Sequence, residues 1–289
     1  IDLKHKDARA ALERLIAKAD VMILNFPVPV RERLRLCWTE VKALNPRLIY
    51  TALTGYGEVG PDIDRPGFDV NAFFARSGLT DGSMYEGGAP TFPVPAQGDR
   101  ATAMTMVAGV LLGLLHRERT GEGSEITTSL LANGVWNNGI YAQAALAGAF
   151  IGHRPPRTSP RNPLSNSFQC ADGRWFVLTL LREDVAWPAV CAALGIDELR
   201  DDPRFAGTEA RIARSGELTT ILQGRLALKD WAAWRPILAR HGLIFSEIQT
   251  ARDLPDDPQI AANGIFVDTG DPQLPRTVAN PINASFAAK

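Results

Sequence analysis

Residues 21–26 read Val21-Met22-Ile23-Leu24-Asn25-Phe26, a short apolar run that lies between two segments with helical spacing. Such a run is typical of a strand that is buried on both faces of a parallel sheet. The next helical pattern covers residues 30–44, and a second β-rich run follows it at residues 47–54. This alternation of helix and strand predicts an α/β fold in which crossover helices join the strands of a parallel sheet.

The middle of the chain continues this pattern and then breaks it. The longest apolar helical pattern, residues 101–115, precedes a third predicted strand at residues 125–131 and a helix at residues 132–149. Residues 152–166 then contain four prolines, a composition typical of a linker or a long loop. We therefore place the end of the first domain at residue 151.

The remaining sequence predicts a second, smaller α+β domain. An Asp172-Gly173 turn between two alternating runs is typical of a β-hairpin. Helical patterns follow at residues 184–194, 208–227 and 229–241, and residues 242–250 have an extended pattern. We predict a large domain at residues 1–151, rejoined by residues 251–289, and a small domain at residues 152–250.

Composition excludes several classes of protein. Lys and Arg number 31 against 32 Asp and Glu, so no basic field attracts nucleic acid. The three cysteines, Cys37, Cys170 and Cys191, have neither metal-ligand spacing nor a disulfide pattern. We expect no metal site, a reducing cytoplasmic location, and no membrane segment, because the apolar run Met104–Leu115 is shorter than a bilayer span.

A glycine motif, Gly55-Tyr56-Gly57-Glu58-Val59-Gly60, follows the second predicted strand. It matches the dinucleotide-binding pattern, which requires a helix to begin within the motif. Pro61 and Pro66 oppose a helix there, so a plain glycine turn is the stronger interpretation. The turn still lies where open α/β sheets bind ligands, and we expect no nucleotide redox cofactor.

Charged residues on the helix after the first strand allow two interpretations. Arg31 and Arg35 are four residues apart and share one face of this helix. They form either a solvated basic face or a contact with a phosphate group.

Asp99 lies in Gly98-Asp99-Arg100, directly before the longest apolar helical pattern. A carboxylate at a helix start faces the positive end of the helix dipole, which favours its ionised form. Asp99 is therefore either an ordinary N-cap or a nucleophile held ready for reaction.

Several segments together resemble the class III CoA-transferase family of the CaiB/BaiF type. That family includes formyl-CoA transferase, carnitine CoA-transferase and α-methylacyl-CoA racemase. The matching segments occur in the family's order at residues 19–26, 43–50, 55–61, 65–69, 98–99 and 114–123. They cover most of residues 8–180, and their order and spacing are more specific than any one of them.

The resemblance implies a Rossmann-like CoA-binding domain, an interlocked homodimer, and CoA transfer from an acyl-CoA to a small carboxylic acid. The aspartate that matches Asp99 attacks the thioester in such enzymes, and an aspartyl-CoA thioester follows. Phe26 matches a position near the adenine of CoA, and Arg33 a position near phosphate. Asn25, Gly55, Tyr56, Gly57 and Arg65 complete the CoA-binding residues that the resemblance implies.

The chain also departs from the family. Against the family pattern we expect the opening βα unit and the closing segment to be missing from residues 1–289, and residues 157–169 contain no glycine-rich loop of the formyl-CoA transferase kind. The racemase branch has a histidine where this chain has Phe68, which cannot transfer a proton. Glu183 lies near the racemase's further carboxylate, and it is equally a first-turn residue of a predicted helix. Racemisation and a non-catalytic CoA-binding subunit remain the alternatives to CoA transfer.

Overall fold

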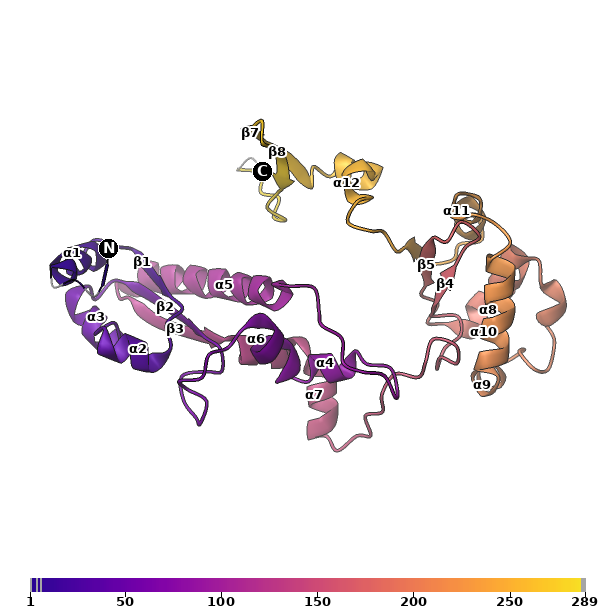
Figure 1. Ribbon diagram of the computed structural model, residues 1–289, viewed down its shortest axis with the longest axis horizontal. Helices are drawn as coiled ribbons and strands as arrows, with labels where there is room; N and C mark the ends of the chain where they lie inside the picture. The colour runs from indigo at the N-terminus through magenta and orange to yellow at the C-terminus, as the bar shows by residue number, and fades with distance from the viewer. Residues whose placement is uncertain (1, 4, 6, 287–289) are drawn as a thin grey trace. The chain divides into compact units, whose positions relative to one another are not determined.

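A computed structural model describes residues 2, 3, 5 and 7–286 of the chain (Figure 1). The chain divides into two compact units, Ile1–Arg154 and Pro155–Lys289. Residues 251–289 fall within the second unit, and their return to the first domain stays a prediction.

The first unit contains a three-stranded parallel sheet in the order β1-β2-β3, as predicted. Its strands are β1 (Val21–Leu24), β2 (Ile49–Thr54) and β3 (Ser124–Ser129). Its helices are α1 (Ala8–Ile16), α2 (Val28–Arg33), α3 (Trp38–Leu44), the π-helical η1 (Asp69–Ala75), α4 (Leu79–Gly82), α5 (Gln97–Thr120), α6 (Leu130–Asn137) and α7 (Gly139–Leu146).

Helices cover both faces of this sheet (Figure 1). Tyr50 and Ala52 on β2 pack into a cluster with residues of α1 and α3. Ile49, the residue before Tyr50 on the same strand, points to the opposite face and lies against Gly113 of α5. β2 therefore lies between two helical layers and is buried on both faces, which is why its sequence is an almost continuous apolar run.

Helix α5 is longer than its sequence pattern predicts. It has 24 residues, and among the described residues it alone is long and apolar enough to span a bilayer by length and composition. Met104–Leu115 is thus only part of a longer helix, and the prediction that this segment is too short for a bilayer span is wrong. One face of α5 nevertheless packs on the sheet, where Gly113 lies against Ile49 and Ile126.

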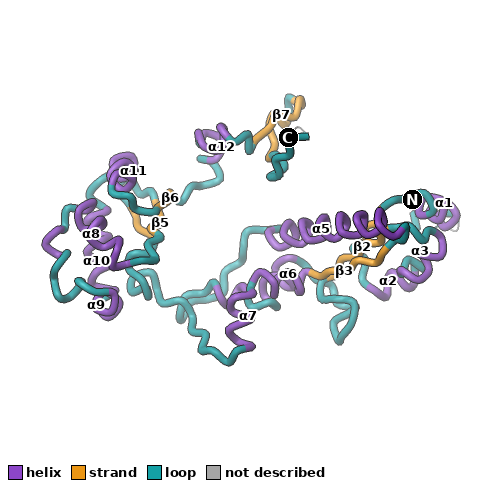
Figure 2. Tube along the Cα trace, turned by 180° about the vertical axis from the view of Figure 1, so that it is seen from behind, coloured by secondary structure: helices purple, strands orange, loops and turns teal. Residues whose placement is uncertain are grey.

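The second unit has a small antiparallel sheet with helices packed around it (Figure 2). Its strands are β4 (Ser167–Gln169), β5 (Trp175–Leu178) and β6 (Phe245–Glu247), and a separate hairpin is formed by β7 (Phe266–Asp271) and β8 (Leu274–Val278). Its helices are α8 (Glu183–Leu194), η2 (Asp197–Leu199), α9 (Thr208–Ala213), α10 (Ser215–Leu226), α11 (Trp231–Arg240), η3 (Leu254–Asp256) and α12 (Pro258–Ala262).

The predicted hairpin at Asp172-Gly173 is confirmed by the antiparallel pairing of β4 with β5. Gly173 has a φ of 79°, a conformation that this turn requires and that glycine adopts without strain. Phe168 and Phe176 face each other across the pair and lie in one large buried cluster with side chains of α8, α10 and α11. The second unit therefore has a core of its own.

Candidate active site

The carboxyl ends of β1 and β2 bring the predicted CoA-binding residues to one edge of the sheet. Asn25 and Phe26 follow β1 directly, and Gly55, Tyr56 and Gly57 follow β2. Leu24 pairs with Ala52 in parallel register, so the two strand ends are neighbours. This edge is the position at which open α/β sheets bind their ligands.

The glycine motif is a turn, and no helix begins between Gly55 and Phe68 in this described segment. The N–H of Gly57 donates to the hydroxyl of Thr54 at 2.9 Å, which folds the chain back at the strand end. A dinucleotide site needs a helix N-terminus at this point. The geometry therefore supports the glycine-turn interpretation over the dinucleotide one.

A second loop packs against this turn through a backbone contact. A Cβ atom on Gly67 would lie 2.6 Å from the Cα of Gly55, so the two glycines can approach only because neither has a side chain. The guanidinium of Arg65 lies 5.5 Å from the ring centroid of Tyr56, a cation–π distance. The structure thus brings Arg65 together with Gly55 and Tyr56.

Arg33 and Arg31 have different environments on α2. Arg33 is exposed, and no described contact joins it to the other predicted CoA-binding residues. Arg31 is only 2% exposed; it donates to both carboxylate oxygens of Glu58, at 2.6 and 2.5 Å, and to the hydroxyl of Tyr50 at 3.2 Å. The interpretation of Arg31 as part of a solvated basic face is therefore wrong, and its contact with a phosphate group stays a prediction. The Nη2 atom of Arg31 donates to both Glu58 oxygens, and this ion pair anchors the glycine turn to α2.

Asp99 is the third residue of α5, and the N-cap position belongs to Ala96. The interpretation of Asp99 as the N-cap is wrong, because Ala96, with a φ of 63°, occupies the N-cap position three residues earlier. The Asp99 side chain is exposed and makes no capping hydrogen bond. It is therefore available to a ligand at the first turn.

The ionisation of Asp99 also differs from the expectation. Its pKa lies above the ordinary value of 3.8, because of partial burial first and the nearby charge of Asp69 second. This upward shift is opposite in direction to the effect expected from the helix dipole alone. A carboxylate with a raised pKa is more basic, which makes its ionised form a better nucleophile.

Asp69, a residue to which sequence reasoning gave no role, starts η1 and is only 7% exposed. Asp69 could have been identified from the sequence because it ends Arg65-Pro66-Gly67-Phe68-Asp69, a segment that resembles the family. The preceding side chain, Phe68, is 71% exposed and has no ionisable group.

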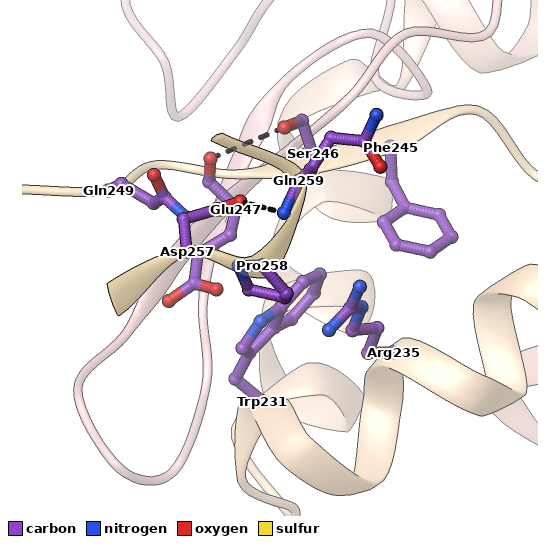
Figure 3. A pocket seen from close by; sticks show the side chains of 9 residues that line it. All are labelled: Trp231, Arg235, Phe245, Ser246, Glu247, Gln249, Asp257, Pro258 and Gln259. Atoms are coloured by element: carbon purple, nitrogen blue, oxygen red, sulfur yellow. Dashed lines mark hydrogen bonds between the residues drawn. The ribbon is translucent and has the colours of Figure 1, made fainter. Parts of the chain in front are cut away.

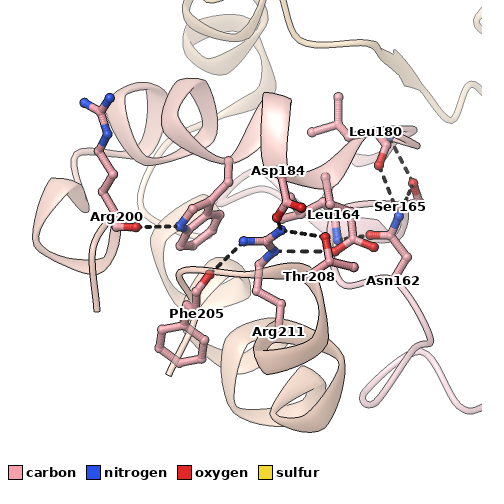
Figure 4. Close-up of polar contacts among 11 residues, drawn as sticks. Asn162, Leu164, Ser165, Leu180, Asp184, Arg200, Phe205, Thr208 and Arg211 are labelled. Carbon is pink, nitrogen blue, oxygen red and sulfur yellow. Dashed lines mark hydrogen bonds and ion pairs between the residues drawn. The ribbon is translucent and has the colours of Figure 1, made fainter. Parts of the chain in front are cut away.

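Glu183 lies in the second unit at the first position of α8 and is 8% exposed. It forms an ion pair with the fully buried Arg211 at 3.5 Å. Arg211 also donates to the carbonyl of Phe205 and the hydroxyl of Thr208, and it pairs with Asp184 (Figure 4). Burial raises the pKa of Glu183 while Arg211 opposes the shift. This carboxylate therefore has a structural role in the small domain.

A cavity of about 450 Å³ lies in the second unit (Figure 3). It is lined by Trp231, Arg235, Phe245, Ser246, Glu247, Gln249, Asp257, Pro258 and Gln259. Its acidic groups are already engaged, because Asp257 caps α12 and accepts from Gln249, and Glu247 pairs with Arg174. The cavity contains none of the predicted site residues. Within the described ranges, no three His, Cys, Asp or Glu residues form a group that could hold a metal ion.

Comparison with known proteins gives a consistent family. The profile of CoA-transferase family III matches residues 1–288. The chain is 30% identical over 274 residues to (R)-2-hydroxy-4-methylpentanoate CoA-transferase of Clostridioides difficile, covering 94% of this chain and 68% of that protein. It is 31% identical over 266 residues to cinnamoyl-CoA:phenyllactate CoA-transferase of Clostridium sporogenes, covering 91% and 64%. The chain thus spans about two thirds of the length of these curated relatives.

Solved structures agree with the sequence comparison. A CaiB/BaiF family protein from Brucella suis has a TM-score of 0.87 and 30% identity, covering 99% of this chain and 74% of that one. Rv3272 from Mycobacterium tuberculosis has a TM-score of 0.83 and 28% identity, with the same coverage. The chain therefore belongs to CoA-transferase family III, a family of enzymes that act on CoA thioesters.

Proposed function

We propose that this chain transfers CoA between an acyl-CoA and a carboxylic acid through a covalent intermediate on Asp99. The observation that carries the proposal is the exposed Asp99 carboxylate on the first turn of α5, in a chain of this family. The first N–H groups of a helix have no partner within the helix, so they can donate to a developing oxyanion.

The proposed reaction begins when a carboxylate oxygen of Asp99 attacks the thioester carbonyl. The carbon–sulfur bond breaks, CoA leaves as a thiolate, and a mixed anhydride remains. The thiolate then attacks the Asp99 carbonyl, which releases the donor acid and leaves an aspartyl-CoA thioester. The acceptor carboxylate attacks this thioester, forms a second anhydride and again releases the thiolate. Attack of the thiolate on the acceptor carbonyl completes the exchange and frees Asp99.

The proposal assigns the CoA moiety to the sheet edge formed by the ends of β1 and β2. Phe26 is assigned to the adenine ring, on which an aromatic side chain can stack, and the exposed Arg33 to phosphate. Asn25, Gly55, Tyr56, Gly57 and Arg65 are assigned to the same edge. The adjacency of β1 and β2 and the contact of Arg65 with Tyr56 support this assignment.

The proposal also includes an interlocked homodimer. An apolar stripe on α5, formed by Met104, Val107, Leu111 and Leu115, is exposed in the single chain. Large apolar side chains on α6 and α7 are exposed as well, namely Trp136, Ile140 and Leu146. Exposed apolar side chains in this number are typical of an interface, and a second copy is the partner the proposal assigns to them. Light scattering that finds a monomer at micromolar concentration would contradict this part.

The names of the two relatives each refer to a 2-hydroxy acid. A panel of candidate acceptors therefore begins with 2-hydroxy acids that carry apolar side chains. Donors are short-chain, branched and aromatic acyl-CoA thioesters. The panel identifies an active donor–acceptor pair, on which the role of Asp99 is then measured.

The test uses mass spectrometry of the intact protein after mixing with an acyl-CoA. The wild type is expected to gain CoA as a thioester, and Asp99→Asn is expected to gain nothing and to lose turnover. Asp81→Asn, an exposed aspartate of the same unit, is the matched control and retains the adduct. Full turnover by Asp99→Asn would end the proposal, and CoA binding without any adduct would favour a non-catalytic subunit.

The racemase alternative has less support. Phe68 supplies no proton, and Glu183 is held by Arg211. Uptake of deuterium at the α-carbon of a 2-methylacyl-CoA in D₂O, with no acceptor present, would establish racemisation in place of CoA transfer.

A further inference from the structure

Asp69 is a buried carboxylate with no partner for its charge. Neither of its carboxylate oxygens has a hydrogen-bond partner among the residues that the structure describes. Buried polar groups are almost always hydrogen-bonded, and an unpaired buried carboxylate destabilises the fold. Asp69 therefore has no described role that supports the structure.

The position of Asp69 relates it directly to the first turn of α5. A Cβ atom on Gly98 would overlap the Oδ1 atom of Asp69 and would lie 2.5 Å from Cδ1 of Phe73. Only glycine at position 98 lets this turn of the helix lie so close to the carboxylate. Asp99 is the next residue of that turn, so its carboxylate and that of Asp69 belong to the same small region.

We propose that Asp69 is a positioning residue for the transfer reaction, whose buried negative charge beside the first turn of α5 makes Asp99 a stronger nucleophile. This inference rests on the proposed role of Asp99 and deepens it. Two nearby carboxylates repel each other when both are ionised. Conversion of Asp99 into a neutral anhydride or thioester removes that repulsion, so Asp69 favours the covalent intermediates over the free enzyme.

The other charged groups around this end of α5 leave Asp69 as the main charge acting on Asp99. On α5 itself, Arg100 is exposed. Helix α6 contains no charged residue, and the charges that act on Glu125 of β3 are those of Glu58 and Arg31. In the loop before η1, Asp62 is paired with Arg65 and Arg76. On α4, Asp81 pairs with His153.

The raised pKa of Asp99 agrees with this arrangement, with Asp69 the one charge that contributes to it.

The direction of the pH effect follows from this repulsion. A carboxyl group with a raised pKa stays protonated, and therefore unreactive, up to a higher pH than an ordinary aspartate. Adduct formation is expected to increase with pH through the pKa of Asp99 and then to reach a plateau. Asp69→Asn removes the repelling charge, so this increase moves to lower pH and the plateau rate falls.

The experiment measures the rate of formation of the aspartyl-CoA adduct between pH 3.5 and pH 8 (about the range in which a carboxyl group with a raised pKa titrates). Asp69→Asn is compared with the wild type and with Thr102→Val. Thr102 is a matched control because it is fully buried on α5 and its hydroxyl has no hydrogen-bond partner among the described residues, but it carries no charge. Only Asp69→Asn is expected to shift the profile, and its thermal midpoint is expected to equal or exceed that of the wild type.

The outcomes separate the two proposals. If the wild type forms no adduct, the role of Asp99 is overturned, and the role of Asp69 with it. If the wild type forms the adduct and Asp69→Asn titrates at the same pH as the wild type, only the role of Asp69 is overturned. Should Asp69→Asn fail to fold, Asp69→Ser removes the same charge with a smaller side chain, and the same shift to lower pH is expected.

Discussion

Replacement of Gly98 by alanine tests whether close packing at the first turn of α5 positions Asp99, the proposed nucleophile. The added methyl group would overlap Cγ of Phe73 and Oδ1 of Asp69. Phe73 is 3% exposed and lies in a cluster with Ala72 and Leu130, so its ring has little space to move. Overpacking of this kind typically costs about 1–3 kcal/mol.

Helix propensity reduces that cost without cancelling it. Alanine is favoured over glycine in a helix interior by up to about 1 kcal/mol, and by less in the first turn. We therefore expect Gly98→Ala to lower the free energy of unfolding by about 1–2 kcal/mol. The rate of adduct formation is expected to fall as well, because α5 must move away from Phe73 and carries Asp99 with it.

Urea unfolding and adduct kinetics measure the two effects. Gly224→Ala is the control, because Gly224 is in helix α10 and an added Cβ would meet no atom within 4 Å. The control is expected to stabilise its unit by about 0.5–1 kcal/mol. The reasoning is refuted if Gly98→Ala unfolds at the same urea concentration as the wild type and forms the adduct at the same rate.

Three further predictions concern stability and reactivity. Arg211→Met leaves a buried carboxylate unpaired, so we expect a loss of about 3–5 kcal/mol in the unfolding free energy of the second unit; a loss under about 1 kcal/mol in urea unfolding would contradict this. Burial raises the pKa of Cys170 to about 11 and that of Cys191 to about 12, so iodoacetamide at pH 8 (well below both) should label them only after unfolding. Rapid labelling of the native protein, seen by peptide mass spectrometry, would be inconsistent with that burial. Ala96→Gly relieves a left-handed backbone conformation and should raise the thermal midpoint, a gain of about 1 kcal/mol or less; a lowered midpoint would argue against strain at this residue.

The parallel sheet was predictable because each of its strands has a recognisable local sequence pattern. β2 is buried along almost its whole length, so its sequence is apolar without alternation, and turn residues bound it at Asn45-Pro46 and Gly55. The hairpin at Asp172-Gly173 was predictable for a similar reason, since a two-residue turn signal needs no distant partner. Family resemblance, rather than local pattern, singled out Asp99.

The features that were missed leave no clear local pattern in the sequence. The ion pair of Arg31 with Glu58 joins residues that are 27 positions apart, and no helical periodicity reveals it. Helix α5 begins earlier in the structure than its sequence pattern predicts, because Ala96 adopts a left-handed conformation that alanine does not favour. The hairpin of β7 with β8 was missed because its exposed strands lack an apolar face. In the first two cases, tertiary structure overrides the local preference.

The contact between Gly55 and Gly67 determines where the loop between them can accept insertions. It closes the intervening loop at its base, so the loop resembles an Ω-loop whose ends are fixed and whose tip, around Gly60, is exposed. Doubling the length of such a loop costs only about 0.6 kcal/mol. Insertions at the tip can therefore reshape the rim of the site while the strand end and Arg65 stay in place. The contact between the two glycines therefore separates the strand end, which must keep its conformation, from the loop tip, whose length and sequence are free to change.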